Sequence, residues 1–136
     1  MARALFVCMD NAGRSQMSQA LFDRAAHGRH EAESAGIAPA THVHPEVAQV
    51  LGEIGIDISG AAPRRLTRAM EERADVVVTI GCSGRHLGVP GTRYVEWDLG
   101  EPQGRSLAEL RITREEIERR VDRLLRELDR VDAWAR

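Results

Sequence analysis

Short runs of apolar and β-branched residues predict four strands, at residues 4–7, 31–35, 75–80 and 93–97. The run at 75–80 is the clearest, because its β-branched residues are unbroken by polar positions. Such a pattern is typical of a strand buried on both faces, as in a parallel sheet. The segment at 31–35 is weaker and ends at Gly36.

Apolar positions three and four residues apart predict helices at residues 14–26, 45–54 and 66–74. Pro45 suits the first turn of the second of these helices, and Gly55 is expected to end it in a left-handed conformation.

The last helix has the most regular pattern. Thr113 and Glu116 have the spacing of a capping box, which predicts that this helix begins at Thr113. Its apolar positions are Ile117, Val121, Leu124, Leu125, Leu128 and Val131.

The alternation of strands and helices predicts an α/β fold with a parallel sheet and right-handed crossovers. Ligands of such sheets bind beyond the carboxyl ends of the strands. Cys8, Cys82 and the acidic pair Asp98 and Glu101 each follow a predicted strand. We therefore expect three chemical groups, distant in sequence, to meet at one edge of the sheet.

The composition limits the class of protein. The 136 residues predict one domain, 1–136, and the net charge of −2 favours neither nucleic acid nor an anionic membrane as partner. No apolar run approaches a membrane-spanning length and no export signal begins the chain, so a soluble, cytoplasmic protein is expected. Two cysteines are too few for a disulfide framework, which leaves inert core thiols or reactive ones.

The stretch FVCMDNAGRSQM places a cysteine at a strand end, a short loop after it and an arginine at the start of a helix. Backbone N–H groups of such a loop and the helix N-terminus form an anion cradle, and Arg14 can hold two oxygens of a tetrahedral anion. The same positive field stabilises a thiolate at Cys8, to which Ser15 can donate a hydrogen bond. The expected oxyanion-binding residues are Met9, Asp10, Asn11, Ala12, Gly13 and Arg14.

Two interpretations of Cys8 remain at this point, a nucleophile in an anion loop or a small buried cysteine at a strand end. The arginine, the serine and the topology favour the nucleophile. Asn11 is expected to fix the loop through its side-chain hydrogen bonds.

LFVCMDNAGRSQM resembles the signature of arsenate reductases built on the low-molecular-weight tyrosine phosphatase fold, most closely that of actinobacterial-type members. The segments SAGIAP, GIDISG, ADVVVTIGC and PGTRYVEWDL also fall where this family has them. The resemblance implies a three-layer sandwich, in which a four-stranded parallel sheet of order 2-1-3-4 carries helices on both faces.

Three features favour reductase over phosphatase within this resemblance. Gln16 follows the Arg-Ser pair where phosphatases tend to have proline, no aromatic residue follows Pro102 in the late loop, and Cys82 supplies a second thiol. The resemblance then implies that Cys8 attacks arsenate, with phosphate or sulfate as competing anions, and that a second thiol releases arsenite. A phosphatase acting on phosphotyrosine or small phosphoesters and a non-catalytic oxyanion-binding or redox-sensing protein remain the alternatives.

The electron transfer departs from the family pattern. His86 stands where close relatives have a third, resolving cysteine. Either a Cys8–Cys82 disulfide forms and is reduced from outside, by thioredoxin or mycoredoxin, or a small thiol such as mycothiol, bacillithiol or glutathione resolves the Cys8 adduct. Arg85 and His86 are expected to lower the pKa of Cys82, although Cys82 as an inert core thiol is the alternative.

Glu101 stands before Pro102, where the family has aspartate. Glu101 or Asp98 is expected to protonate the leaving oxygen, unless both are solvated loop acids. A carboxylate facing a bound oxyanion would repel it, so Asp10 is expected to point outward.

No bound metal or cofactor is expected. Some relatives bind potassium, but Gln19 and Arg64 stand where their acids lie, although Asn11 and Ser34 match. His42 and His44 lack a third ligand nearby, which favours a solvated loop over a metal pair. A monomer is expected.

Overall fold

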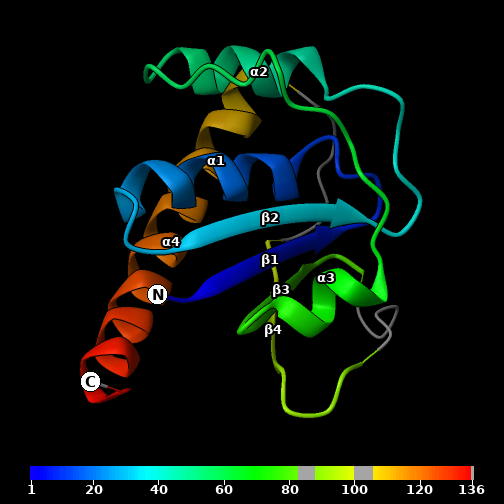
Figure 1. Cartoon of the computed structure of the whole chain (residues 1–136). Coiled ribbons are helices and arrows are strands. Elements are labelled where there is room, and N and C mark those ends of the chain that lie inside the picture. The colour runs from blue at the N-terminus through cyan, green and yellow to red at the C-terminus, as the bar shows by residue number, and fades with distance from the viewer. Residues whose placement is uncertain (83–87, 100–105, 136) are drawn as a thin grey trace.

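A computed structural model describes residues 1–82, 88–99 and 106–135, with side chains up to residue 131. Strands and helices alternate along the first half of the chain, and the longest helix ends it (Figure 1). The elements in chain order are β1 (Arg3–Cys8), α1 (Arg14–Ala26), β2 (Glu31–Gly36), α2 (Pro45–Gly52), α3 (Arg68–Arg73), β3 (Val76–Ile80), β4 (Arg93–Trp97) and α4 (Leu107–Ala135).

The four strands form one parallel sheet in the order β2-β1-β3-β4, which confirms the predicted fold class and strand order. Helices α1 and α4 lie on one face of this sheet and α3 lies on the other, while α2 packs against α4 on the outer side, away from the sheet (Figure 1). Cys8 is the last residue of β1 and Cys82 follows β3, and these two carboxyl ends are neighbours because the strands pair directly.

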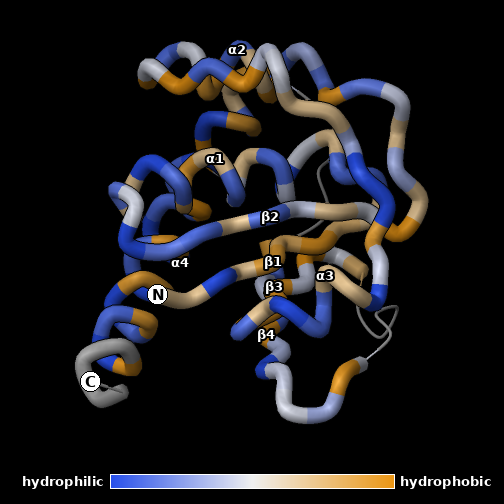
Figure 2. The backbone as a smooth tube through the Cα atoms, in the orientation of Figure 1, coloured by the Kyte–Doolittle hydropathy of each residue, from blue (hydrophilic) through white to orange (hydrophobic). Residues whose placement is uncertain are grey.

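Side chains of β1 alternate between two hydrophobic clusters, one on each face of the sheet. Phe6 and Cys8 belong to the cluster beneath α1 and α4, whereas Leu5 and Val7 belong to the smaller cluster beneath α3. The apolar colouring of β1 and β3 in Figure 2 reflects this burial from both sides.

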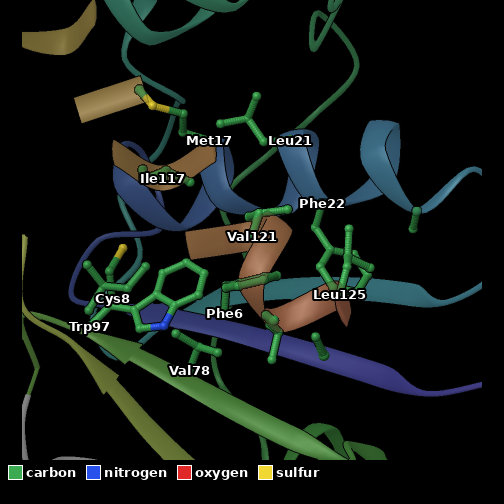
Figure 3. Packing of buried hydrophobic residues seen from close by; sticks show 14 of the residues in the cluster. Phe6, Cys8, Met17, Leu21, Phe22, Val78, Trp97, Ile117, Val121 and Leu125 are labelled. Atoms are coloured by element: carbon green, nitrogen blue, oxygen red, sulfur yellow. The ribbon is translucent and has the colours of Figure 1, made fainter. Parts of the chain in front are cut away.

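Phe6 is the centre of the larger cluster. Its ring centroid lies 5.8 Å from that of Phe22 on α1 and 5.6 Å from that of Trp97 on β4 (Figure 3). These aromatic contacts fix α1 and β4 relative to β1, and with them the strand end that carries Cys8.

The helix over residues 45–54 is two residues shorter than predicted, but its end has the expected form. Gly55 adopts a φ of +83°, and the Ile56 N–H donates to the Leu51 carbonyl at 3.0 Å while the Gly55 N–H donates to the Gly52 carbonyl at 3.1 Å. This pair of bonds is a Schellman motif, in which glycine tolerates the left-handed residue.

The predicted start of the last helix is wrong. The helix α4 begins at Leu107, and Ser106 Oγ accepts the Glu109 N–H at 3.1 Å as its cap. Thr113 lies inside the helix, where its hydroxyl donates to the Glu109 carbonyl at 3.1 Å. A serine three residues ahead of a glutamate gives the same local signal as Thr113 and Glu116, and Leu110, buried against the core, selects the earlier one.

None of the helices in the described part of the chain combines the length and the apolarity that crossing a membrane requires.

Candidate active site

Cys8 ends β1 and is only 3% exposed. Its sulfur lies 2.8 Å from Ser15 Oγ and accepts the backbone N–H of Asn11 at 3.2 Å. Hydrogen bonds donated to a sulfur favour its charged form over its neutral form. The Asn11 N–H and the Ser15 hydroxyl are donors that suit a thiolate, whereas the protonated thiol can donate to Asp10 Oδ1 at 3.7 Å.

Asn11 organises this loop from its centre. It adopts a left-handed φ of +51°, its Nδ2 donates to Ser15 Oγ at 2.7 Å, and its Oδ1 accepts the Gln16 side chain at 3.1 Å and the Arg64 N–H at 2.9 Å. Because Ser15 Oγ already accepts a hydrogen from Asn11, its own hydrogen is available for the sulfur of Cys8.

Arg14 is the first residue of α1, and its guanidinium lies against the backbone of Gly81 after β3. A Cβ atom on Gly81 would stand 2.8 Å from an Arg14 nitrogen, so glycine leaves room for the guanidinium at this point. Gly13 precedes Arg14 as the N-cap, and the first turn of α1 holds no acidic residue. The positive end of the helix and the guanidinium both face the loop.

A cavity of about 330 Å³ opens above the loop. Its described lining residues are Cys8, Met9, Asp10, Gly13, Arg14, His44, Val47, Gly81, Leu110 and Thr113. None of these residues is Phe, Tyr or Trp, and the imidazole of His44 is their only aromatic ring. The cavity thus joins the ends of β1 and β3 to the N-terminal parts of α1, α2 and α4.

The sequence analysis missed four lining residues, His44, Val47, Leu110 and Thr113. His42 and His44 lie in the loop before α2 as expected, with His42 exposed, but His44 is half-buried against the anion loop. The backbone N–H of His44 donates to the Ala12 carbonyl at 2.9 Å. This bond attaches the residue before α2 to the anion loop. Its position directly before Pro45, at a predicted helix start, was the one available signal.

The orientation expected for Asp10 is met only in part, because its side chain is 44% exposed but does not point away from the loop. Its Oδ1 turns back into the loop, where it accepts the Ala12 N–H at 3.1 Å and lies 3.7 Å from the sulfur of Cys8. Its Oδ2 lies 3.4 Å from His44 Nε2. An aspartate readily accepts the N–H two residues ahead of it, and this local bond turns one oxygen of the carboxylate into the loop while the side chain stays partly in water.

Cys82 is buried two residues after the end of β3, and its thiol donates to the Val7 carbonyl at 3.5 Å. Burial raises the pKa of the Cys82 thiol above its ordinary value. The expected lowering of this pKa is therefore wrong. The residues invoked for it, Arg85 and His86, lie outside the described residues, and the protein interior around the sulfur opposes its ionisation.

Glu101, the first candidate for the general acid, also lies outside the described residues. Asp98, the second candidate, is exposed, and its carbonyl accepts the Arg120 guanidinium at 3.0 Å. Asp98 is not one of the described residues that line the cavity.

The residues compared with a potassium site form hydrogen bonds between uncharged groups. Ser34 donates to the Gln19 side chain at 2.7 Å, and Asn11 Oδ1 is shared by Gln16 and Arg64 as described above. Within residues 1–82, 88–99 and 106–135, no three His, Cys, Asp or Glu side chains gather as metal ligands would.

Comparisons with known proteins place this site in context. The family model described as low molecular weight phosphotyrosine protein phosphatase matches residues 3–88. A putative arsenate reductase of Halobacterium salinarum is 40% identical over 121 residues, which are 85% of each chain.

Two further relatives carry the name of a protein reductant. The glutaredoxin arsenate reductase of a Synechocystis species is 30% identical over 92% of this chain and 97% of its own. The solved thioredoxin-dependent arsenate reductase of Corynebacterium glutamicum superposes with a TM-score of 0.85 at 36% identity and covers 95% of this chain. This chain spans only 62% of that longer one.

Proposed function

The chain belongs to the low molecular weight phosphotyrosine protein phosphatase family, within which we propose that it acts as an arsenate reductase in arsenic detoxification. The observation that carries this proposal is the sulfur of Cys8, which meets Ser15 Oγ at 2.8 Å and the Asn11 N–H at 3.2 Å on the wall of the cavity. The similarity to named arsenate reductases over most of the chain supports the choice of reaction.

In the first step, the Cys8 thiolate attacks the arsenic of arsenate. A sulfur–arsenic bond forms, an arsenic–oxygen bond breaks, and the leaving oxygen departs as water once an acid has protonated it. Arg14 and the backbone N–H groups of residues 9–13 hold the remaining oxygens, which suits a fork-shaped guanidinium at a helix N-terminus.

In the second step, another thiolate attacks the sulfur of Cys8. A disulfide forms, the sulfur–arsenic bond breaks, and its electron pair stays on arsenic, so As(V) becomes As(III) and leaves as arsenite. Two thiols are oxidised for each arsenate reduced. Cys82 or an external thiol supplies the second sulfur.

The acid of the first step is Glu101 or Asp98 in this proposal. Both residues follow β4, whose carboxyl end faces the same edge of the sheet as the anion loop. A carboxylic acid that delivers one proton to the leaving oxygen satisfies the chemistry from either position.

An external reductant closes the cycle, because the disulfide formed in each turnover must be reduced before the next. The names of two relatives point to thioredoxin or glutaredoxin systems. Mycoredoxin, mycothiol, bacillithiol and glutathione fit the same chemistry. Phosphate and sulfate, as tetrahedral anions, are the expected competitors of arsenate.

A phosphatase is the second candidate, and the placement of Cys82 favours it. A phosphatase needs no second thiol, and the thiol of Cys82 is buried and bonded to Val7 rather than directed at Cys8. Against it, none of the described lining residues is Phe, Tyr or Trp, so the large aromatic side chains on which a phosphotyrosine would stack are missing from this lining.

One experiment separates the two candidates. Purified protein is given arsenate with thioredoxin, glutaredoxin and small-thiol systems in turn, and arsenite release and reductant oxidation are measured beside hydrolysis of nitrophenyl phosphate. Arsenite release that disappears in Cys8→Ser supports the reductase. Rapid hydrolysis of nitrophenyl phosphate, with no reductant consumed in the presence of arsenate under any system, overturns it.

A further inference from the structure

Asp10 occupies a place in the anion loop that suits an oxyanion better than a carboxylate. Its Oδ1 accepts the Ala12 N–H at 3.1 Å and lies 3.7 Å from the sulfur of Cys8. Ala12 is one of the residues whose N–H groups surround the anion in the proposed function. The Asp10 carboxylate thus takes a donor that a bound oxyanion needs, and adds a negative charge beside it.

His44 holds the other oxygen of the same carboxylate. Its Nε2 lies 3.4 Å from Asp10 Oδ2, and its side chain is 23% exposed at the rim of the cavity. The backbone N–H of His44 donates to the Ala12 carbonyl at 2.9 Å, which holds the residue beside the anion loop, and the absence of a side chain at Gly13 leaves room for its ring.

We propose that Asp10 and His44 together control the affinity of the anion loop for a tetrahedral oxyanion. The Asp10 carboxylate competes with the oxyanion for the loop, and His44 draws this carboxylate out of the loop. A histidine gains its proton between about pH 5 and 8. Protonated His44 attracts the Asp10 carboxylate away from the Ala12 N–H and cancels its charge. Neutral His44 leaves the carboxylate in the loop. This inference rests on the proposed function only in that the loop binds a tetrahedral oxyanion.

Other charged groups around the pair must be separated from this effect. Cys8 and Arg14 line the same cavity, Glu46 lies in the first turn of α2, and α4 contributes only Leu110 and Thr113, which carry no charge. Arginine stays charged throughout this pH range. The measurement is made with Cys8→Ser, which removes the thiol from the cavity.

The probe is sulfate, which remains a dianion throughout this pH range, unlike arsenate and phosphate. Its affinity is measured by calorimetric titration of the full-length Cys8→Ser protein between about pH 5 and 8. We expect the affinity to fall as the pH rises. The double variant with Cys8→Ser and His44→Gln should bind sulfate weakly even at the acid end of the range. Its affinity there should equal that of the Cys8→Ser protein at the alkaline end.

Two substitutions of Asp10 separate its charge from its hydrogen bond. Asp10→Asn removes the charge but can keep the bond to Ala12, and Asp10→Ala removes both. We expect sulfate affinity at the alkaline end to rise modestly in Asp10→Asn and by roughly tenfold in Asp10→Ala. Asp57 provides a matched control, because its Oδ1 accepts the Ser59 N–H two residues ahead at 2.9 Å outside the cavity. Asp57→Ala should leave sulfate affinity unchanged.

Unchanged sulfate affinity in both Asp10 variants overturns the inference and leaves the proposed function standing. The same holds if His44→Gln keeps the full pH dependence of the parent. Absence of sulfate binding in every variant overturns both the inference and the anion loop of the proposed function. Folding is followed by thermal melting, and Asp10→Asn, which retains the loop bond, keeps the test decisive if Asp10→Ala melts early.

Discussion

Cys8 ends β1 and Cys82 follows the neighbouring strand β3 by two residues, but the two thiols belong to hydrophobic clusters on opposite faces of the sheet. Cys8 belongs to the hydrophobic cluster beneath α1 and α4, and Cys82 belongs to the cluster beneath α3, where its thiol donates to the Val7 carbonyl. A disulfide between them requires Cys82 to leave that carbonyl and pass around the strand end. Direct attack by a small thiol on the Cys8 adduct requires no such movement.

Cys82→Ser tests which thiol resolves the adduct. We expect it to abolish arsenite release driven by thioredoxin, because thioredoxin reduces a disulfide that only Cys82 can form with Cys8 inside this chain. Release driven by a small thiol with glutaredoxin should persist, since that thiol attacks Cys8 directly. Arsenite is measured with each reductant, and Cys8→Ser should abolish release with both. Thioredoxin-driven release that survives in Cys82→Ser would exclude the internal disulfide.

Ser15→Ala removes the hydroxyl that lies 2.8 Å from the sulfur of Cys8. A hydrogen bond to a charged group contributes about 1.5–3 kcal/mol, so alkylation of Cys8 by iodoacetamide at neutral pH should slow roughly 10- to 100-fold. Arsenite release should slow in parallel.

Ser18→Ala is the control for Ser15→Ala. It deletes a buried hydroxyl from the same helix, but one that donates to the Arg14 carbonyl at 2.7 Å rather than to the sulfur. Equal slowing of alkylation in the two variants would mean that Ser15 acts through the stability of α1 and not on Cys8.

Gly81→Ala should weaken arsenate binding. The new methyl group would stand 2.8 Å from an Arg14 nitrogen and displace the guanidinium, so the KM for arsenate should rise roughly tenfold as one charge-assisted contact is lost. Gly28→Ala is the matched control, because Gly28 has a similar positive φ, +79° against +68°, but no atom within 4 Å of its Cβ position. Both substitutions should cost about 1–2 kcal/mol of stability. A KM that rises equally in both would refute the role given to Gly81.

Glu53 links α2 to α4 and should make stability depend on acid pH. Hydrogen bonds from Arg111 and Arg114 lower the pKa of Glu53 from 4.5 to about 2. Because the folded pKa is the lower one, the stabilisation is fully present above pH 4.5 and is lost as the pH falls toward 2. The free energy of unfolding of Glu53→Gln, measured with urea, should lie below that of the wild type at neutral pH and converge with it near pH 2.

Glu72→Gln serves as the control for Glu53→Gln. Glu72 pairs with Arg68 one turn earlier on the surface of α3, and both side chains are more than half exposed. Such pairs contribute little, so the unfolding curves should match the wild type at neutral pH. A difference between Glu53→Gln and the wild type that persists unchanged in acid would contradict the assignment to ionised Glu53.

The sheet could be predicted from the sequence because buried strand positions hold apolar or β-branched residues, which form recognisable runs. Val76 to Ile80 is buried at every position, and only apolar or β-branched residues fit there. The N-terminus of α4 could not be fixed in the same way. Ser106 and Thr113 carry equivalent local signals, and the choice between them depends on a tertiary contact of Leu110 with the core.

In the candidate site too, contacts within one loop could be predicted from the sequence, whereas contacts between distant segments could not. Cys8, Asn11 and Ser15 lie within eight residues of chain, so a single tight loop brings them together and the local sequence predicts their contact. His44 and Thr113 line the cavity because α2 and α4 pack beside the anion loop. This tertiary packing cannot be predicted from the local sequence around either residue. The orientation of Asp10 depends on a competition between one backbone N–H and water, and no pattern of residue types encodes its outcome.

The bond from the Arg64 N–H to Asn11 Oδ1 spans 53 residues, and the Gln16 side chain reaches the Ala62 carbonyl across 46. The loop that carries Cys8 therefore completes its geometry only when a distant segment has docked beside it. The reactivity proposed for Cys8 therefore depends on long-range contacts, and we expect a partly folded chain to hold an ordinary thiol at this position. A peptide that carries only the signature is not expected to reproduce this reactivity. The motif supplies the residues, but contacts with residues 62 and 64 hold them in the required geometry.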